Sequence, residues 1–156
     1  MDIYEFRIRG VGKVRVFGMI DDHSRFVPAL RIYKRKTAAN AIETLANALG
    51  TGRKPRAIYV DNGRQFIAKS FRQFCENNDI KLIVGRPYNP QGRGKIEAFF
   101  KIMHRELISQ VVFSDLDHAH LELSRFRGKY NNVRRHGGIG WIVPAQRYFK
   151  EMKSLQ

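Results

Sequence analysis

The sequence predicts a single α/β domain, with a mixed five-stranded sheet of three antiparallel strands followed by two parallel strands, flanked by helices. Apolar and polar residues alternate in three runs, at 3–8, 14–20 and 26–33, as in an antiparallel meander. Helical patterns then alternate with two short apolar runs, at 58–60 and 81–84, which is typical of buried parallel strands. A chain of 156 residues can bury a core of its own, so we expect residues 1–156 to form one domain.

Turn and cap residues indicate where the first elements begin and end. Asp21 and Asp22 read as turn residues together with Ser24, between the second and third strands. Thr37 is a suitable N-cap for a helix that ends at Gly50 and carries its alanine, isoleucine and leucine side chains on one face. The meander is therefore followed by an amphipathic helix.

The middle of the chain predicts a second helix, the last strand and an irregular loop. The helix, near 70–77, carries apolar side chains at spacings of three and four, Cys75 among them. A lone cysteine on such a face reads as a buried, inert core residue, and it forms neither a disulfide framework nor a zinc site. Prolines and glycines exclude regular structure between 85 and 94, so we expect Pro87 to Gly94 to be among the most mobile internal segments.

Two longer helices complete the expected fold. The first begins at Gly94 and runs to about Gln110. Its apolar face comprises Ile96, Phe99, Phe100, Met103 and Leu107. A different face carries the polar residues Glu97, Lys101, His104 and Arg105. Ser114, with Asp117 three residues later, looks like a capping box that opens a further helix to about Tyr130.

The charge of the chain predicts a polyanionic partner. The net charge is +15 and the sequence pI is near 10.4. Nucleic acid is the expected partner, and ribosomal or membrane-surface association are the alternatives that charge alone leaves open. No run of residues approaches the length of a membrane span, and no N-terminal pattern of charged and then apolar residues indicates export.

Asp61 and Glu97 are the most informative pair in the sequence. Asp61 ends the apolar strand of Ala57-Ile-Tyr-Val-Asp-Asn-Gly, and Glu97 follows Gly94-Lys-Ile, with 97 − 61 − 1 = 35 residues between the two acids. Together with Asp2 they resemble the D,D-35-E constellation of retroviral integrases and of the transposases of bacterial insertion sequences. Residues 61–66 are similar to the D-[NS]-G-x-x-F motif of that family, and residues 88–97 to its Y-N-P-Q-x-x-G-x-x-E motif.

A second signature closes the chain. Residues 130–149 are similar to the Y-N-x-x-R-x-H-x-x-L-x-x-x-P-A-x-x-F pattern that ends many insertion-sequence transposases, so the resemblance covers essentially the whole chain. It implies a ribonuclease H-like fold and a homodimer or larger assembly. Family members usually carry an N-terminal helix-turn-helix or zinc-binding region, so we expect this chain to be a fragment that lacks that DNA-binding region.

The resemblance implies a site for two Mg²⁺ or Mn²⁺ ions, with Asp2, Asp61 and Glu97 as ligands and catalytic residues. Two such ions activate the attacking oxygen and stabilise the leaving oxygen in a displacement at phosphorus, and they prefer oxygen ligands. Each acid also has a structural alternative. Asp61 could form an Asx-turn, Glu97 could complement the helix dipole, and Asp2 could fray at the terminus. His104 and His136 are not expected to bind these ions.

Basic residues around the expected site are candidates for DNA contact. With two polar neighbours, they are Tyr88, Gln91, Arg93, Lys95, Lys101 and Arg105. A denser basic run further along the chain predicts a second contact with DNA or with a partner protein, with a solvated surface as the alternative. Its members are Arg125, Arg127, Lys129, Arg134 and Arg135.

We therefore expect a metal-dependent transposase or integrase core that hydrolyses phosphodiester bonds and transfers a 3′-hydroxyl into target DNA. Its expected partners are element ends and target DNA, with no membrane, and its expected location is the bacterial cytoplasm, at the nucleoid. Two alternatives remain open: a ribonuclease H-type or RuvC-type nuclease without strand transfer, and a non-catalytic DNA-binding remnant of a transposon.

Overall fold

The strands of the protein are those that the sequence predicts. The computed structural model describes residues 1–51, 53–85 and 93–154. An antiparallel sheet in the order β1-β2-β3 is formed by β1 (Asp2–Ile8), β2 (Gly12–Met19) and β3 (Ala29–Tyr33). A parallel pair is formed by β4 (Ala57–Val60) and β5 (Lys81–Val84). The third strand is shorter than expected, because the chain from Phe26 to Pro28 lies outside the ladder.

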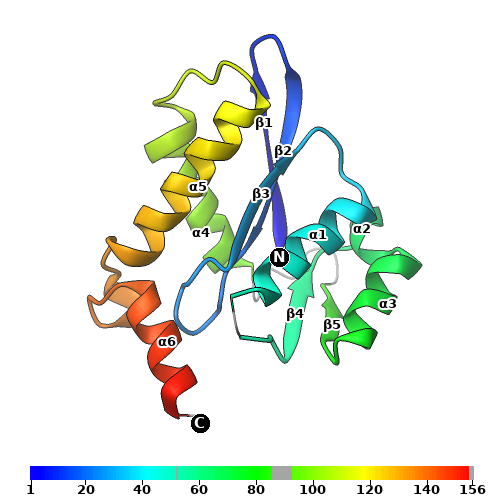
Figure 1. Ribbon diagram of the computed structural model, residues 1–156, viewed down its shortest axis with the longest axis vertical. Coiled ribbons are helices and arrows are strands. Elements are labelled where there is room, and N and C mark those ends of the chain that lie inside the picture. Colours follow the sequence, from blue (N-terminus) through cyan, green and yellow to red (C-terminus); the bar gives the residue numbers. More distant parts are fainter. Residues whose placement is uncertain (52, 86–92, 155–156) are drawn as a thin grey trace.

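Six α-helices surround these strands in the described part of the chain (Figure 1). They are α1 (Ala38–Leu49), α2 (Arg64–Ile67), α3 (Lys69–Asn77), α4 (Gly94–Met103), α5 (Leu116–Asn132) and α6 (Pro144–Ser154). A π-helical segment, His104–Ile108, follows α4 directly, and a 3₁₀ turn, Gly137–Ile139, follows α5. None of the described helices is long and apolar enough to cross a membrane.

The three-stranded sheet lies between two apolar cores (Figure 1). Side chains alternate between its two faces, so Val14 and Val16 of β2 contribute to one core while Phe17 and Met19 contribute to the other. The first core is completed by α4 and α5, and the second by α1, α3 and the β4-β5 pair. Cys75 is buried in the second core, as expected, and burial raises the pKa of its thiol.

Within the described residues, the five strands form two separate hydrogen-bonded sheets and not one continuous ladder. A cavity of about 440 Å³ lies where β4 approaches β1 and the end of β2, and residues of all three strands line it. One hydrogen bond nevertheless joins the two sheets, because the Met1 ammonium donates to the Tyr59 carbonyl at 2.8 Å. This bond fixes the start of β1 beside the end of β4.

The helices differ from the prediction in two of their boundaries and in their number. The N-cap of α5 is Asp115 and not Ser114, because the Asp115 carboxylate accepts the His118 N–H at 2.8 Å. The helix predicted to run to Gln110 changes to π-helical pairing at His104. Neither α2 nor α6 was predicted. The four residues of α2 are too few to establish a periodic pattern.

Candidate active site

Asp2 is held firmly at the start of β1, so it does not fray as a terminal residue could. It faces Gly18 across the β1-β2 ladder and is only 9% exposed. Its Oδ1 accepts the Ile3 N–H at 2.8 Å. Burial lowers the pKa of the Met1 ammonium beside it to about 6. The first candidate ligand is therefore a buried carboxylate in a fixed orientation.

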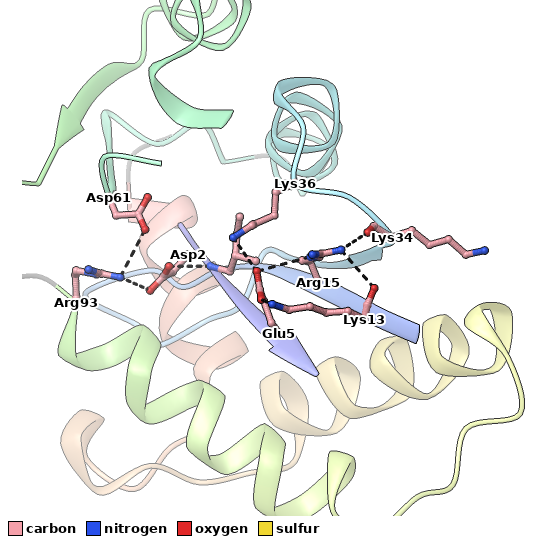
Figure 2. Close-up of polar contacts among 9 residues, drawn as sticks. Asp2, Glu5, Lys13, Arg15, Lys34, Lys36, Asp61 and Arg93 are labelled. Carbon is pink, nitrogen blue, oxygen red and sulfur yellow. Dashed lines mark hydrogen bonds and ion pairs between the residues drawn. The ribbon is translucent and has the colours of Figure 1, made fainter. Parts of the chain in front are cut away.

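Asp61 follows β4 and forms an Asx-turn, the structural alternative to a role as metal ligand. Its Oδ1 accepts the Gly63 N–H at 2.8 Å. An added Cβ at position 63 would lie 2.2 Å from Gln65 Nε2 and 2.8 Å from Asp61 Oδ1, so any larger residue there would displace these two side chains. The turn occupies one carboxylate oxygen and leaves Oδ2 directed towards Arg93 (Figure 2). A structural role and a role as ligand are therefore compatible in this residue.

Arg93 joins the two aspartates (Figure 2). Its Nη2 lies 3.0 Å from Asp2 Oδ2 and 3.9 Å from Asp61 Oδ2. The hydrogen bond to Asp2, together with the charges of Asp2, Asp61 and Glu97, raises the pKa of the guanidinium. Arg93 was expected to contact DNA, and in this structure it neutralises the carboxylates.

Glu97 lies on the first turn of α4, where its charge complements the helix dipole. Its side chain is exposed. In the ranges 1–51, 53–85 and 93–154, no three histidine, cysteine or acidic side chains are assembled to hold a metal ion. The structure therefore brings Asp2 and Asp61 together and leaves the third predicted ligand outside that pair.

The other basic residues near Glu97 differ in their partners. Lys95 Nζ lies 2.5 Å from Asp22 Oδ1, while Arg105 contacts Glu106 at 3.1 Å. Lys101 is exposed and has no side-chain hydrogen bond or ion pair to any described residue. Tyr88 and Gln91 lie outside the described residues, as does most of the segment from Pro87 to Gly94.

The second basic run is partly built into the fold. Arg127 donates to the Pro28 carbonyl at 2.9 Å, and burial lowers its pKa. Arg134 binds both carboxylate oxygens of Glu106, at 2.7 and 2.8 Å. Arg125 pairs with Glu122 at 2.7 Å, whereas Lys129 and Arg135 are exposed. Two of the five candidates, Arg127 and Arg134, therefore stabilise tertiary structure.

His104 and His136 both contact other side chains of the protein. His104 Nδ1 is hydrogen-bonded to the Tyr4 hydroxyl. His136 packs edge-on against Tyr130, and burial lowers the pKa of its imidazole. Neither belongs to a group of three described histidine, cysteine or acidic residues that could hold a metal ion.

Known proteins are similar to this chain in sequence and in fold. Two family profiles described as Integrase core domain match the chain, over residues 1–90 and 78–144. The chain belongs to the integrase core domain family. Its fold matches the catalytic core domain of BIV integrase with a TM-score of 0.73 and 22% identity, over 99% of this chain and 97% of that one. The HTLV-2 integrase catalytic core domain in complex with magnesium matches with a TM-score of 0.74 and 19% sequence identity, over 93% of this chain and 90% of that one. The fold of this integrase core is thus ribonuclease H-like.

Two curated relatives extend the family to mobile elements and retroviruses. An uncharacterized 39.2 kDa protein of insertion element IS476 from Xanthomonas euvesicatoria is 25% identical over 146 residues, which are 94% of this chain and 42% of that protein. The Gag-Pro-Pol polyprotein of squirrel monkey retrovirus is 37% identical over 108 residues, 69% of this chain and 6% of the polyprotein. The integrase core therefore spans less than half the length of these relatives.

Two residues of the site had no role in the sequence prediction. Asp22 was expected only as a turn residue, yet it binds the Lys95 ammonium 73 positions away. Met1 was not considered, yet its ammonium joins the two sheets. Both contacts depend on tertiary structure, and no local sequence pattern indicates them.

Proposed function

We propose that this integrase core is a DDE-type polynucleotidyl transferase, which hydrolyses a phosphodiester bond of donor DNA and transfers the 3′-hydroxyl into target DNA. The observation that carries the proposal is the convergence of Asp2 and Asp61, from strands of different sheets, on one shared cation. Family membership supports it, because the chain belongs with integrase cores. The net charge of +15 supports DNA as the partner.

The donor set fits a divalent cation. Asp2 and Asp61 offer oxygen atoms alone, which Mg²⁺ and Mn²⁺ prefer. The position of Arg93 between them supports the fit, because its guanidinium already places positive charge against both carboxylates. Asp2, Asp61 and Glu97 would hold two ions, which when bound neutralise charge at phosphorus and activate the attacking oxygen.

The residues of the chain position the reaction. Asp2 is oriented by the Ile3 N–H, and Asp61 by the Gly63 N–H, so both carboxylates are fixed before any substrate arrives. Such preorganisation lowers the entropic cost of reaching the transition state. Lys95 and Lys101 lie on the same helix as Glu97 and would bind phosphate groups on either side of it.

We further propose that the active form is a homodimer or a larger assembly acting on element ends and target DNA. The HTLV-2 core, a structural neighbour, has been solved in dimeric and trimeric forms. Sedimentation of this chain with and without DNA tests the assembly separately from the chemistry.

A joining assay separates the three candidate functions. A labelled oligonucleotide duplex is incubated with the protein and Mg²⁺ or Mn²⁺, and the products are resolved by length. Strand-transfer products support the transferase. Cleavage without joining indicates a nuclease, and a mobility shift without chemistry indicates a DNA-binding remnant.

The role proposed for Glu97 has its own test, because Glu97 is exposed on the first turn of α4, whereas the two aspartates are joined by Arg93. Glu97→Gln preserves the shape of the side chain but removes the charge that would hold a cation, so joining should be abolished while DNA affinity is largely kept. Glu76→Gln, an exposed acid on α3, is the matched control and should join DNA normally. A Glu97→Gln protein that joins DNA at the parent rate overturns the role of Glu97.

A further inference from the structure

Trp141, the only tryptophan of the chain, is held outward by a closed loop and is 70% exposed. Its backbone N–H donates to the His136 carbonyl at 2.9 Å, and the backbone N–H of His136 donates to the Ile142 carbonyl at 3.1 Å. Ile139, within the loop, is buried. Trp141 has a φ of 60°, which is rare for a bulky residue and persists only where the surroundings enforce it. The loop therefore maintains a strained backbone while its aromatic ring faces solvent.

The orientation of the indole is set by a glycine. A Cβ added at Gly137 would lie 3.4 Å from Trp141 Cζ2, so the ring lies close against this backbone. This contact covers one part of the ring and leaves the remainder exposed. A ring that is already oriented loses little conformational freedom when a ligand stacks on it.

Two arginines lie at or beside this loop. Arg135 is exposed and, within the described part of the chain, its guanidinium has no hydrogen bond or ion pair. Arg25 Nη2 is 3.9 Å from the Cβ position of Gly138. An exposed indole on a loop that has one arginine before it in the chain and another beside Gly138 matches the combination of stacking platform and phosphate-binding groups that proteins use for single-stranded nucleic acid.

The loop is connected to the candidate active site through the turn between β2 and β3. Arg25 donates to the Asp22 carbonyl, and Lys95 Nζ donates to the same carbonyl at 2.9 Å. Lys95 lies two residues after Arg93, which contacts both aspartates. A series of polar contacts thus leads from the 137–141 loop towards the aspartate pair.

We infer that Trp141 stacks on an unpaired base of the DNA substrate, close to the end that is processed. In a duplex each base face is covered by its neighbour, so the indole requires a base with a free face, at an overhang or a frayed end. Charge complementarity favours DNA over a protein partner or a second copy of the chain, because Arg25 lies beside Gly138 of this loop, Arg135 precedes the loop in the chain, and the net charge is +15. This inference rests on the proposed function, since it deepens the description of its substrate.

The sole tryptophan reports directly on the contact. DNA with a short single-stranded overhang should quench the fluorescence of Trp141 without metal, whereas a blunt duplex of the same length should quench it less. Trp141→Ala should weaken binding to the overhang DNA about 5- to 100-fold and leave blunt-duplex affinity almost unchanged. Trp141→Phe should retain part of the preference.

Two further variants separate the ring from the fold. Trp141→Gly removes the ring and also relieves the strain at φ 60°, so it should melt no lower than the parent yet lose the overhang preference. Val133→Ala removes another exposed apolar side chain on the same segment and should bind normally.

Distinct outcomes would overturn the two proposals. Equal affinity of parent and Trp141→Gly for overhang DNA overturns the stacking inference alone. A blue shift of the tryptophan emission with protein concentration, without DNA, assigns the ring to a contact between copies of the chain and also overturns it. Failure of the parent protein to bind any DNA overturns the proposed function itself.

Discussion

Arg93 Nη2 lies 3.0 Å from Asp2 Oδ2, although the two residues are 91 positions apart in the chain. The same nitrogen lies 3.9 Å from Asp61 Oδ2, so one guanidinium neutralises two candidate metal ligands. Arginine does not lose its proton in the ordinary pH range. A metal ion that binds both aspartates must therefore displace this guanidinium or share the carboxylates with it.

Removing Arg93 should strengthen metal binding. Arg93→Gln deletes the competing cation, so the affinity for Mn²⁺ without DNA should rise several-fold, as expected for an ion pair worth about 1 kcal/mol. Isothermal titration with Mn²⁺ measures the change. Lys101→Gln, a charge removed from the same helix without an ion pair, should leave the affinity nearly unchanged. Equal Mn²⁺ affinity in the parent and Arg93→Gln would show that Arg93 does not compete.

Asn131 should be among the most important polar residues for stability. Its Oδ1 accepts the Val27 N–H at 2.8 Å, and its Nδ2 donates to the Val27 carbonyl at 2.9 Å, with both residues buried. Asn131→Ala leaves two buried backbone groups unpaired and should lower the free energy of unfolding by about 2–4 kcal/mol. Urea denaturation measures this loss. Asn132→Ala, at an exposed neighbour, should change stability by no more than about 0.5 kcal/mol.

Local patterns predicted most of the fold. The Thr37 cap is confirmed, because its hydroxyl accepts the Asn40 N–H at 3.1 Å. Strand and helix periodicities depend on neighbouring residues, and five apolar side chains from Ile96 to Leu107 are buried as predicted. The predicted cap of α5 was wrong because Ser114 and Asp115 can both cap a helix, and the sequence spacing does not distinguish them.

The partners of charged residues could not be predicted in the same way. Arg127 and Arg134 were grouped with exposed cations because they lie in one basic run, but they bind Pro28 and Glu106, 99 and 28 positions away. The Arg93 contact with Asp2 is of the same kind. Ion pairs between distant residues depend on how helices pack, and composition alone does not reveal this.

Glu5 should make stability depend on pH in acid. Lys13 and Lys36 bind its carboxylate and lower its pKa from 4.5 to about 2 (Figure 2). Because the pKa of Glu5 is lower in the folded state, its carboxylate stabilises the fold fully above about pH 4.5. This stabilisation is lost as the pH falls through about 2. Because both lysines are partly exposed, we expect the charge on Glu5 to contribute about 1–3 kcal/mol to the free energy of unfolding.

The variant Glu5→Gln isolates this contribution. Its stability deficit against the parent should be largest near pH 7 and should disappear as the pH approaches 2, measured by urea denaturation across that range. Glu76→Gln, which alters an exposed acid on α3, should show a much smaller deficit. A Glu5→Gln deficit that stays constant down to pH 2 contradicts the ion-pair explanation.

Lys101 should contact phosphate when DNA binds. It lies one turn beyond Glu97 on α4, is exposed, and has no ion pair with the described residues. Each phosphate neutralised contributes about −0.9 to the slope of log affinity against log salt on duplex DNA. Lys101→Ala should therefore weaken binding to all duplex sequences alike and make the slope shallower by about that amount.

Lys69→Ala, at an exposed lysine on α3, is the control and should keep the parent slope, because α3 packs on the other side of the three-stranded sheet from α4. Fluorescence anisotropy over a series of salt concentrations measures both slopes. If Lys101→Ala keeps the parent slope while Lys69→Ala reduces it, DNA lies on the α3 side and not along α4.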